Sequence, residues 1–172
     1  MICWGDNSPT LDKILKVWYN ESTKQMKGDN IMTVTVEKIN SVMNSSIGSM
    51  TFYKREYGKN MDYTEGVMEV QRQLGMYWFV DMMYSHMPAV VDDHNQTEET
   101  FYVVKLDVNN DNTAHLTITR EHYDEESDEY KDIIVAEQHI DYTDLPQCTM
   151  KFYLELANWE PLVFRLLCPS EH

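Results

Sequence analysis

The residues best placed for chemistry by type and spacing are Asp107, Asn109 and Asp111, which stand at every second position. A calcium-binding loop begins in this way. A complete loop also needs a glycine, where this chain has Asn112, and a bidentate carboxylate, where it has Ile118. The ligand count therefore fails, and the same residues fit a turn between two strands.

The rest of the sequence has no catalytic motif. The six histidines never share one face at metal-ligand spacing, and the three cysteines are too far apart for a zinc finger. There is no phosphate loop, dinucleotide fingerprint or nucleophile elbow. A serine, a histidine and an aspartate can be chosen from any chain of this size, so their presence says nothing. We expect no enzyme, no metal and no cofactor.

A site for a cationic amine is the remaining polar possibility. It would need a buried carboxylate flanked by aromatic rings, so that charge and cation–π attraction act together. The candidates are Glu69, Asp81 and Glu137, and only Asp81 neighbours an aromatic cluster, at residues 77–79. Asp81 is therefore the residue expected to orient a polar or cationic ligand.

Length and charge limit the class of protein. At 172 residues the chain predicts a single domain, residues 1–172, long enough to bury a sizeable core. Its formal charge of −15, from 29 acids and 14 bases, argues against a nucleic-acid partner and fits a well-solvated protein. No apolar run approaches the length of a membrane span.

Three glycosylation sequons, at Asn20, Asn44 and Asn95, favour secretion. Residues 1–5 have neither the basic start nor the apolar core of a signal peptide, so a secreted protein would here be in its mature form. We therefore expect an extracellular glycoprotein.

Most of the chain has the period-two alternation of antiparallel strands joined by short turns. A short helix is expected to open at Ser8 and to present Leu11 and Trp18 on one face. The expected strands are residues 31–39, 50–54, 63–71, 75–80, 89–91, 100–106, 114–119 and 130–135. Their spacing favours a closed up-and-down barrel.

A barrel of this size can hold one small ligand, and its inward side chains alternate along each strand. Strand 75–80 is apolar on both faces, so either Tyr77 and Phe79 or Trp78 and Val80 point inward. The expected lining is Met32, Val34, Val36, Met50, Phe52, Met68, Tyr77, Phe79, Asp81, Tyr102, Val104, Leu106, Leu116, Ile118, Ile133 and Val135. The same residues would equally fill a closed core with nothing bound.

The last quarter of the chain is expected to form a helix that packs outside the barrel. Thr143 or Asp144 can cap it, Pro146 lies in its first turn, and Pro161 ends it. Within it an apolar side chain recurs every four residues, at positions 148, 152 and 156, and the run 162–167 follows as an extended segment.

Residues 141–168 also carry a family resemblance. The pattern Tyr-x-x-Leu-Pro-x-Cys, with a Phe four residues later and then Val-Phe-x-x-x-Cys, resembles the C-terminal signature of tick salivary lipocalins. The resemblance implies an all-β fold with one C-terminal helix: an eight-stranded antiparallel barrel around a ligand cavity. The family's amine-binding members carry a Cys-Asp motif and a Glu-Leu-aromatic motif. This chain lacks the Cys-Asp motif, and it has Ala136-Glu137-Gln138 where the second motif is expected.

The resemblance implies a secreted salivary protein that binds a sterol such as cholesterol, or a fatty acid, and modulates host immune cells such as dendritic cells. Scavenging of histamine or serotonin is an alternative, as is a filled barrel whose loops bind a host protein. The family's cysteines pair with strand cysteines that this chain lacks, so we expect Cys3–Cys148 with Cys168 free. Cys3–Cys168, or three reduced thiols, remain open.

Overall fold

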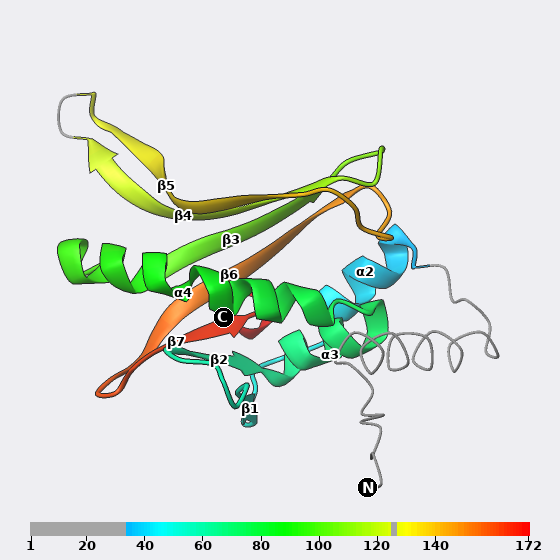
Figure 1. Cartoon of the computed structure of the whole chain (residues 1–172), viewed down its shortest axis with the longest axis horizontal. Coiled ribbons are helices and arrows are strands. Elements are labelled where there is room, and N and C mark those ends of the chain that lie inside the picture. The colour runs from blue at the N-terminus through cyan, green and yellow to red at the C-terminus, as the bar shows by residue number, and fades with distance from the viewer. Residues whose placement is uncertain (1–33, 125–126) are drawn as a thin grey trace, which may run out of the picture. The chain divides into compact units, whose positions relative to one another are not determined.

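The computed structural model describes residues 34–124 and 127–172 (Figure 1). The helix expected at Ser8, Met32 and the first part of strand 31–39 lie outside these residues. In chain order the elements are α2 (Val36–Met43), β1 (Phe52–Tyr53), β2 (Met61–Thr64), α3 (Glu65–Leu74), α4 (Tyr77–Thr97), β3 (Phe101–Val108), β4 (Ala114–Asp124), β5 (Glu129–Ile140), β6 (Cys148–Trp159), β7 (Leu162–Leu167) and the 3-10 turn η1 (Pro169–Glu171).

The strands of the described residues form one seven-stranded sheet in the order β1-β2-β7-β6-β3-β4-β5. All neighbours are antiparallel except β2 and β7, which run parallel. The outermost strands β1 and β5 do not pair with each other, so the sheet is open. The predicted eight-stranded antiparallel barrel is therefore wrong, because a barrel requires its first and last strands to join.

Helix α4 replaces two predicted strands, residues 75–80 and 89–91. Its buried residues recur at helical spacing and face the sheet: Phe79, Val80, Met83, Tyr84, Met87, Val90 and His94. The apolar run at its start fits a period of two as well as 3.6, which is why it resembled a strand. Pro88 predicts a break, but it lies on the exposed side of the helix, where a lost backbone hydrogen bond is tolerated.

Helices α2 and α3 replace the predicted strands 31–39 and 63–71 over most of their described length. Thr35 caps α2 by accepting a hydrogen bond from the Lys38 backbone N–H, and Thr64 caps α3 in the same way. The local capping preference of threonine thus decides against a strand. Strand β1 covers two residues of the predicted strand 50–54. None of the described helices is both long and apolar enough to cross a membrane.

The predicted C-terminal helix is a pair of strands, β6 and β7. Cys148, Phe152 and Leu156 are four residues apart, a spacing that places them on one face of a helix but also on one face of a strand. Met150 and Leu154 complete the strand pattern, and the intervening side chains are more exposed. The pairing of β6 with both β3 and β7 decides between the two patterns. The extended segment predicted at 162–167 is confirmed as β7.

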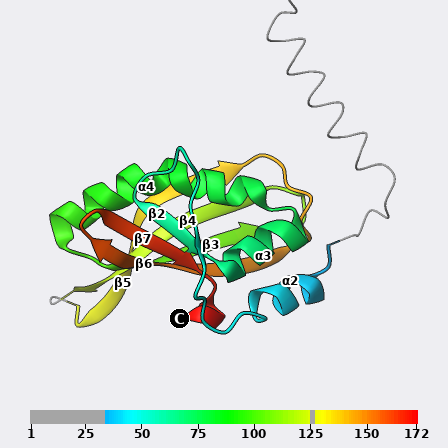
Figure 2. The same cartoon turned by 90° about the horizontal axis from the view of Figure 1, so that it is seen from below.

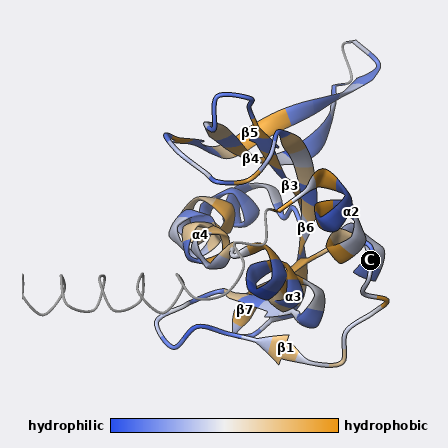
Figure 3. Cartoon of the chain, turned by 90° about the vertical axis from the view of Figure 1, so that its right-hand side faces the viewer, coloured by the Kyte–Doolittle hydropathy of each residue, from blue (hydrophilic) through white to orange (hydrophobic). Residues whose placement is uncertain are grey.

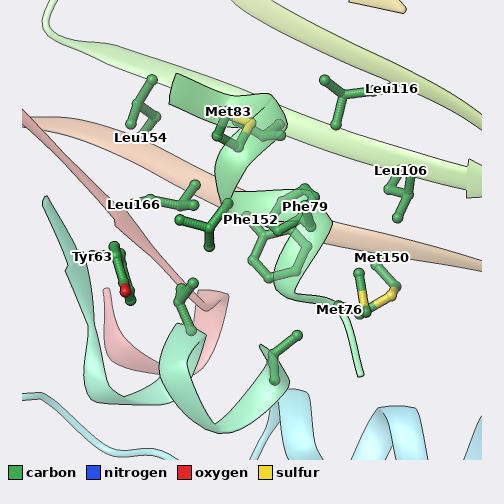
Figure 4. Packing of buried hydrophobic residues seen from close by; sticks show 14 of the residues in the cluster. Tyr63, Met76, Phe79, Met83, Leu106, Leu116, Met150, Phe152, Leu154 and Leu166 are labelled. Atoms are coloured by element: carbon green, nitrogen blue, oxygen red, sulfur yellow. The ribbon is translucent and has the colours of Figure 1, made fainter. Parts of the chain in front are cut away.

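The predicted strands 100–106, 114–119 and 130–135 are confirmed within β3, β4 and β5. Helices α3 and α4 lie on one side of the sheet, and the strands curve around them (Figures 2 and 3). That side holds the core (Figure 4), where the rings of Phe79 on α4 and Phe152 on β6 lie 4.5 Å apart between centroids. Both side chains are completely buried.

Several residues expected to line a cavity are part of this packed core. Tyr102, Val104, Leu106, Leu116 and Ile118 have no exposed surface and belong with Phe79 to one cluster of buried side chains. Their inward orientation follows from the strand alternation, as predicted. What they face is α4, because the sheet does not close and its apolar side needs a helix to cover it.

A polar cluster fixes the end of α4 to the sheet. The Asp93 carboxylate accepts hydrogen bonds from Arg120 Nε on β4 and from the Tyr102 hydroxyl on β3, both at 3.1 Å. Burial, together with the Asp93 charge, raises the pKa of Tyr102, so its hydroxyl stays a donor. The cluster therefore joins α4 to β4 at Arg120, after which the residues of β4 are more exposed.

A second polar cluster ties η1 to the start of α3. The Glu171 carboxylate accepts hydrogen bonds from the Thr64 hydroxyl at 2.6 Å, the Gly66 N–H at 3.2 Å, the Cys168 N–H at 3.1 Å and the Ser49 hydroxyl. An anion at a helix N-terminus is stabilised by the free N–H groups and the helix dipole. Glu171 therefore supplies the negative charge that stabilises the N-terminus of α3.

Stability at high pH is expected to depend on Cys168. Its burial, with Glu171 nearby, raises the pKa of the thiol to about 12. In the unfolded chain the thiol loses its proton above about pH 8.5, whereas the folded chain keeps it, so the unfolded state binds fewer protons and stability falls as pH rises. We expect this thiol to remove about 2 kcal/mol of unfolding free energy between about pH 8 and about pH 10.

Urea unfolding of wild type and Cys168→Ala at the two pH values measures this contribution. Burial also raises the pKa of Tyr84 and Tyr102, so both proteins should lose stability with pH, and the wild type more steeply. Equal slopes for the two proteins would show that Cys168 does not titrate in this way.

Candidate functional site

The side of the sheet turned away from α4 carries the candidate site. We call it the open face. Its residues alternate with the core residues along β3, β4, β5 and β6, and α4 lies on the other side of these strands (Figure 3). The open face includes Val103, Lys105, Thr117, Thr119, Glu121, Tyr123, Tyr130, Asp132, Ile134, Thr149 and Lys151.

Two lysines stand directly opposite each other on this face. Lys105 on β3 is the register partner of Lys151 on β6, and both are exposed. Asp107 binds the Lys105 ammonium at 2.8 Å, and Lys151 Nζ lies 5.0 Å from the centre of the Tyr153 ring. No carboxylate among residues 34–124 and 127–172 pairs with Lys151. Like charges at such positions destabilise a sheet.

Asp107 belongs to this cationic end. Burial alone would raise the pKa of its carboxyl, but hydrogen bonds from Lys105 and from the Thr149 hydroxyl lower it below its ordinary value. Asp107 is therefore charged over the physiological range and holds Lys105 in place. Lys151 remains the cation that is available to a binding partner.

Two carboxylates stand opposite each other at the other end. Glu121 on β4 is the register partner of Asp132 on β5, and both are exposed. Within the described part of the chain neither carboxylate makes an ion pair or a side-chain hydrogen bond. The next register pair is Tyr123 and Tyr130, whose ring centroids lie 5.2 Å apart. The end of the hairpin thus presents acidic and aromatic groups together.

A hollow of about 560 Å³ lies between these ends. It is lined by Val103, Lys105, Thr117, Thr119, Asp132, Ile134, Thr149 and Lys151. Ile134 is 57% exposed, which is high for a branched apolar side chain. The register of β4 and β5 shifts between Ile118 and Thr119. From this bulge the hairpin turns away from α4 toward its tip (Figure 1).

The predicted carboxylate Asp81 lies elsewhere, in a groove of about 480 Å³ beside α4. The aromatic rings next to it are Tyr57 and Tyr84, not the cluster at 77–79. Asp81 accepts hydrogen bonds from Arg55 Nε at 3.1 Å and from the Tyr57 hydroxyl. Its charge is balanced by Arg55, so the groove has no free carboxylate to attract an amine.

The other two candidate carboxylates are on different elements. Glu69 on α3 is bonded to Arg72 and Gln73. Glu137 on β5 lies on the open face, 3.4 Å from His115 Nε2. The structure therefore does not bring Glu69, Asp81 and Glu137 together around one ligand.

The remaining expected cavity residues are dispersed. Val34, Met68 and Val135 pack against the edge of the core, and Ile133 is half-buried on β5. Val36, Met50 and Tyr77 are exposed, and Phe52 stacks with the Arg165 guanidinium. Cys148 and Cys168 are free thiols, and Cys3 lies outside the described residues, as does Asn20. Asn44 and Asn95 are exposed, and their glycosylation remains a prediction.

The residues of the calcium-like motif form the turn between β3 and β4. Asp111 Oδ1 accepts hydrogen bonds from the Thr113 N–H at 3.1 Å and hydroxyl at 2.7 Å, and Asn112 has a φ of 65°. Within the described residues no three His, Cys, Asp or Glu side chains gather where they could hold a metal.

Sequence reasoning missed the charged pairs because they depend on strand register. The expected strands end at residue 119 and resume at 130, but Glu121 and Asp124 lie in β4 and Glu129 begins β5. The alternation of side chains along each strand could have identified this face. Lys105, Thr117 and Thr119 occupy the polar positions of strands whose apolar positions were assigned correctly.

No curated protein and no solved structure matches this chain. The family of unknown function DUF6876 matches residues 37–172, which include every described helix and strand except the first residue of α2. The chain therefore belongs to the DUF6876 family.

Proposed function

We propose that this chain is a binding module that contacts a protein partner through the open face. The observation that supports the proposal is the pair of like-charged register partners, Lys105 with Lys151 and Glu121 with Asp132, at the two ends of one hollow. Like charges in register are unfavourable in a sheet, and among the described residues only the lysine pair has a counter-charge of its own, Asp107 beside Lys105. A partner that supplies opposite charges turns this internal repulsion into binding energy and specificity.

The arrangement favours a protein over the other classes of partner. Thr117, opposite Lys105, and Glu121 are four residues apart on β4, so the two charged ends are separated by about 14 Å along the strands. A nucleic-acid backbone offers negative charge alone and would be repelled by the carboxylate end. A protein surface can offer a carboxylate, an apolar centre and a cation at this spacing, matching Val103 and Ile134 in the middle.

The interior gives no comparable support for a carried lipid. The sterol or fatty-acid carrier expected from the lipocalin resemblance depends on a hollow barrel, and the open sheet instead packs its apolar side against α4. A binding module agrees with the expected alternative of a protein that binds a host protein, except that its binding surface is the open face and not the loops.

Site-specific photo-cross-linking in cells that express the protein tests this proposal. A benzophenone amino acid in place of Thr117, which lines the hollow, is expected to give a discrete protein adduct. The same residue in place of Asn95, exposed on α4, is the control and should give none. Adding Lys105→Glu and Lys151→Glu should remove the Thr117 adduct. Equal adducts at both positions, or adducts to nucleic acid or lipid alone, would contradict the proposal.

A further inference from the structure

We propose that the partner of the open face is a second copy of this chain. The inference rests on the proposed function and names its partner. The face is complementary to itself: its cationic end, Lys105 and Lys151, and its anionic end, Glu121 and Asp132, lie on opposite sides of one hollow. A two-fold symmetric contact pairs each residue with a different residue of the other copy, so the two ends can satisfy each other twice.

The geometry of the contact follows from the positions of the pairs. A two-fold axis that lies between the two faces and crosses the strands near Val103 and Thr119 places the carboxylate pair of each copy over the lysine pair of the other. Val103 and Ile134 then meet near the axis, where they lose their exposure to water. Packed sheets are about 10 Å apart, a distance that lysine and glutamate side chains span together.

Charge balance also supports this occupant. At the lysine end Asp107 balances Lys105, and Glu137, opposite Thr117 in the same cross-strand row, lies 3.4 Å from His115 Nε2. Lys151 has no carboxylate partner among the described residues, and neither Glu121 nor Asp132 has a cation partner among them. The excess negative charge of the chain opposes association at long range, since each copy carries −15. This repulsion is screened beyond about 8 Å at physiological ionic strength, whereas the interface pairs lie within that range. The charge pairs across the contact therefore outweigh the repulsion between the net charges of the two copies.

Charge reversal provides a selective test on the purified chain. Sedimentation equilibrium over a concentration series is expected to show a wild-type dimer. K105E/K151E and E121K/D132K should each be monomeric, because each places like charges across the contact. Mixed together, the two variants should form a one-to-one heterodimer, since both ends are then opposite in sign. The control K54E/K59E has the same charge change at exposed lysines that do not line the hollow and should remain dimeric.

The heterodimer separates this inference from misfolding, because unfolded variants would not restore association. A monomeric wild type, or variants that fail to associate when mixed, would overturn it. The photo-cross-link at Thr117 separates it from the proposed function. An adduct of twice the chain mass supports both the binding module and the second copy as its partner. A protein adduct of another mass keeps the binding module and overturns the second copy, and a missing adduct overturns the binding module as well.

Discussion

Replacing Phe79 with alanine is expected to lower the free energy of unfolding by about 4 kcal/mol. The ring is completely buried and lies 4.5 Å from the Phe152 ring, between α4 and the centre of the sheet. Its removal loses the transfer free energy of the side chain and leaves a cavity that the rigid sheet cannot close. Urea unfolding followed by circular dichroism measures the loss.

Two comparisons make this test specific. Tyr77→Ala, on the exposed side of the same helix, should cost less than about 0.5 kcal/mol apart from helix propensity. The double variant with Phe152→Ala should show a coupling of about 1 kcal/mol, as for rings in contact. If Phe79 lined an open ligand cavity, its truncation would enlarge an existing space, and a loss below about 1.5 kcal/mol would contradict the packed core described here.

Replacing Glu171 with alanine is expected to cost about 3 kcal/mol. The change removes the carboxylate that accepts hydrogen bonds from four donors. Three of these donors, the Thr64 hydroxyl and the backbone N–H groups of Gly66 and Cys168, belong to buried residues. Donors left without a partner in a buried place lose their hydration as well as their hydrogen bond. The loss should appear as a lower urea midpoint with an unchanged slope.

The matched control for this variant is Glu160→Ala, an exposed glutamate between β6 and β7. Glu171→Gln keeps the side-chain length and one acceptor oxygen, so its stability should fall between wild type and Glu171→Ala. Gly66→Ala should resemble Glu171→Ala, because an added Cβ would stand 2.4 Å from Glu171 Oε2. Equal stability of the Glu171 and Glu160 variants would show that the carboxylate does not hold α3.

The part of the fold that could be predicted from the sequence is the meander β3–β4–β5. There the alternation of apolar and polar side chains is strict, as in Tyr102, Val104 and Leu106, and the turns between strands are rich in Asp and Asn. These local signals agree with the tertiary structure, so the strands and their inward faces were assigned correctly.

Elsewhere the local patterns fit two structures equally well. Cys148, Phe152 and Leu156 satisfy both helical and strand spacing, and the family resemblance favoured the helix. The run at 75–80 has the same ambiguity, and Pro88, a residue type that favours a break, lies within one continuous helix. Strand pairing resolves the case of β6, and packing against the sheet resolves the case of α4. Both are tertiary properties that periodicity does not contain.

The candidate site could be predicted even less. Lys105 and Lys151 are far apart in the sequence, and nothing local shows that they are opposite each other. Asp81 was selected for its neighbours in sequence, but its neighbours in space, Arg55 and Tyr57, come from a loop whose position the sequence does not reveal.

The parallel pairing of β2 with β7 affects how the nascent chain reaches its native state. Asp62 and Arg165, which join the two strands by a double hydrogen bond, are 103 residues apart. At a translation rate of about 5–20 residues per second, roughly 5–20 s pass between the synthesis of β2 and the synthesis of β7. Because β7 separates β2 from the rest of the sheet, β1 and β2 cannot join any other strand first. Over that interval the ribosome carries an incomplete sheet, in which strand edges that β7 covers in the native state have no partner.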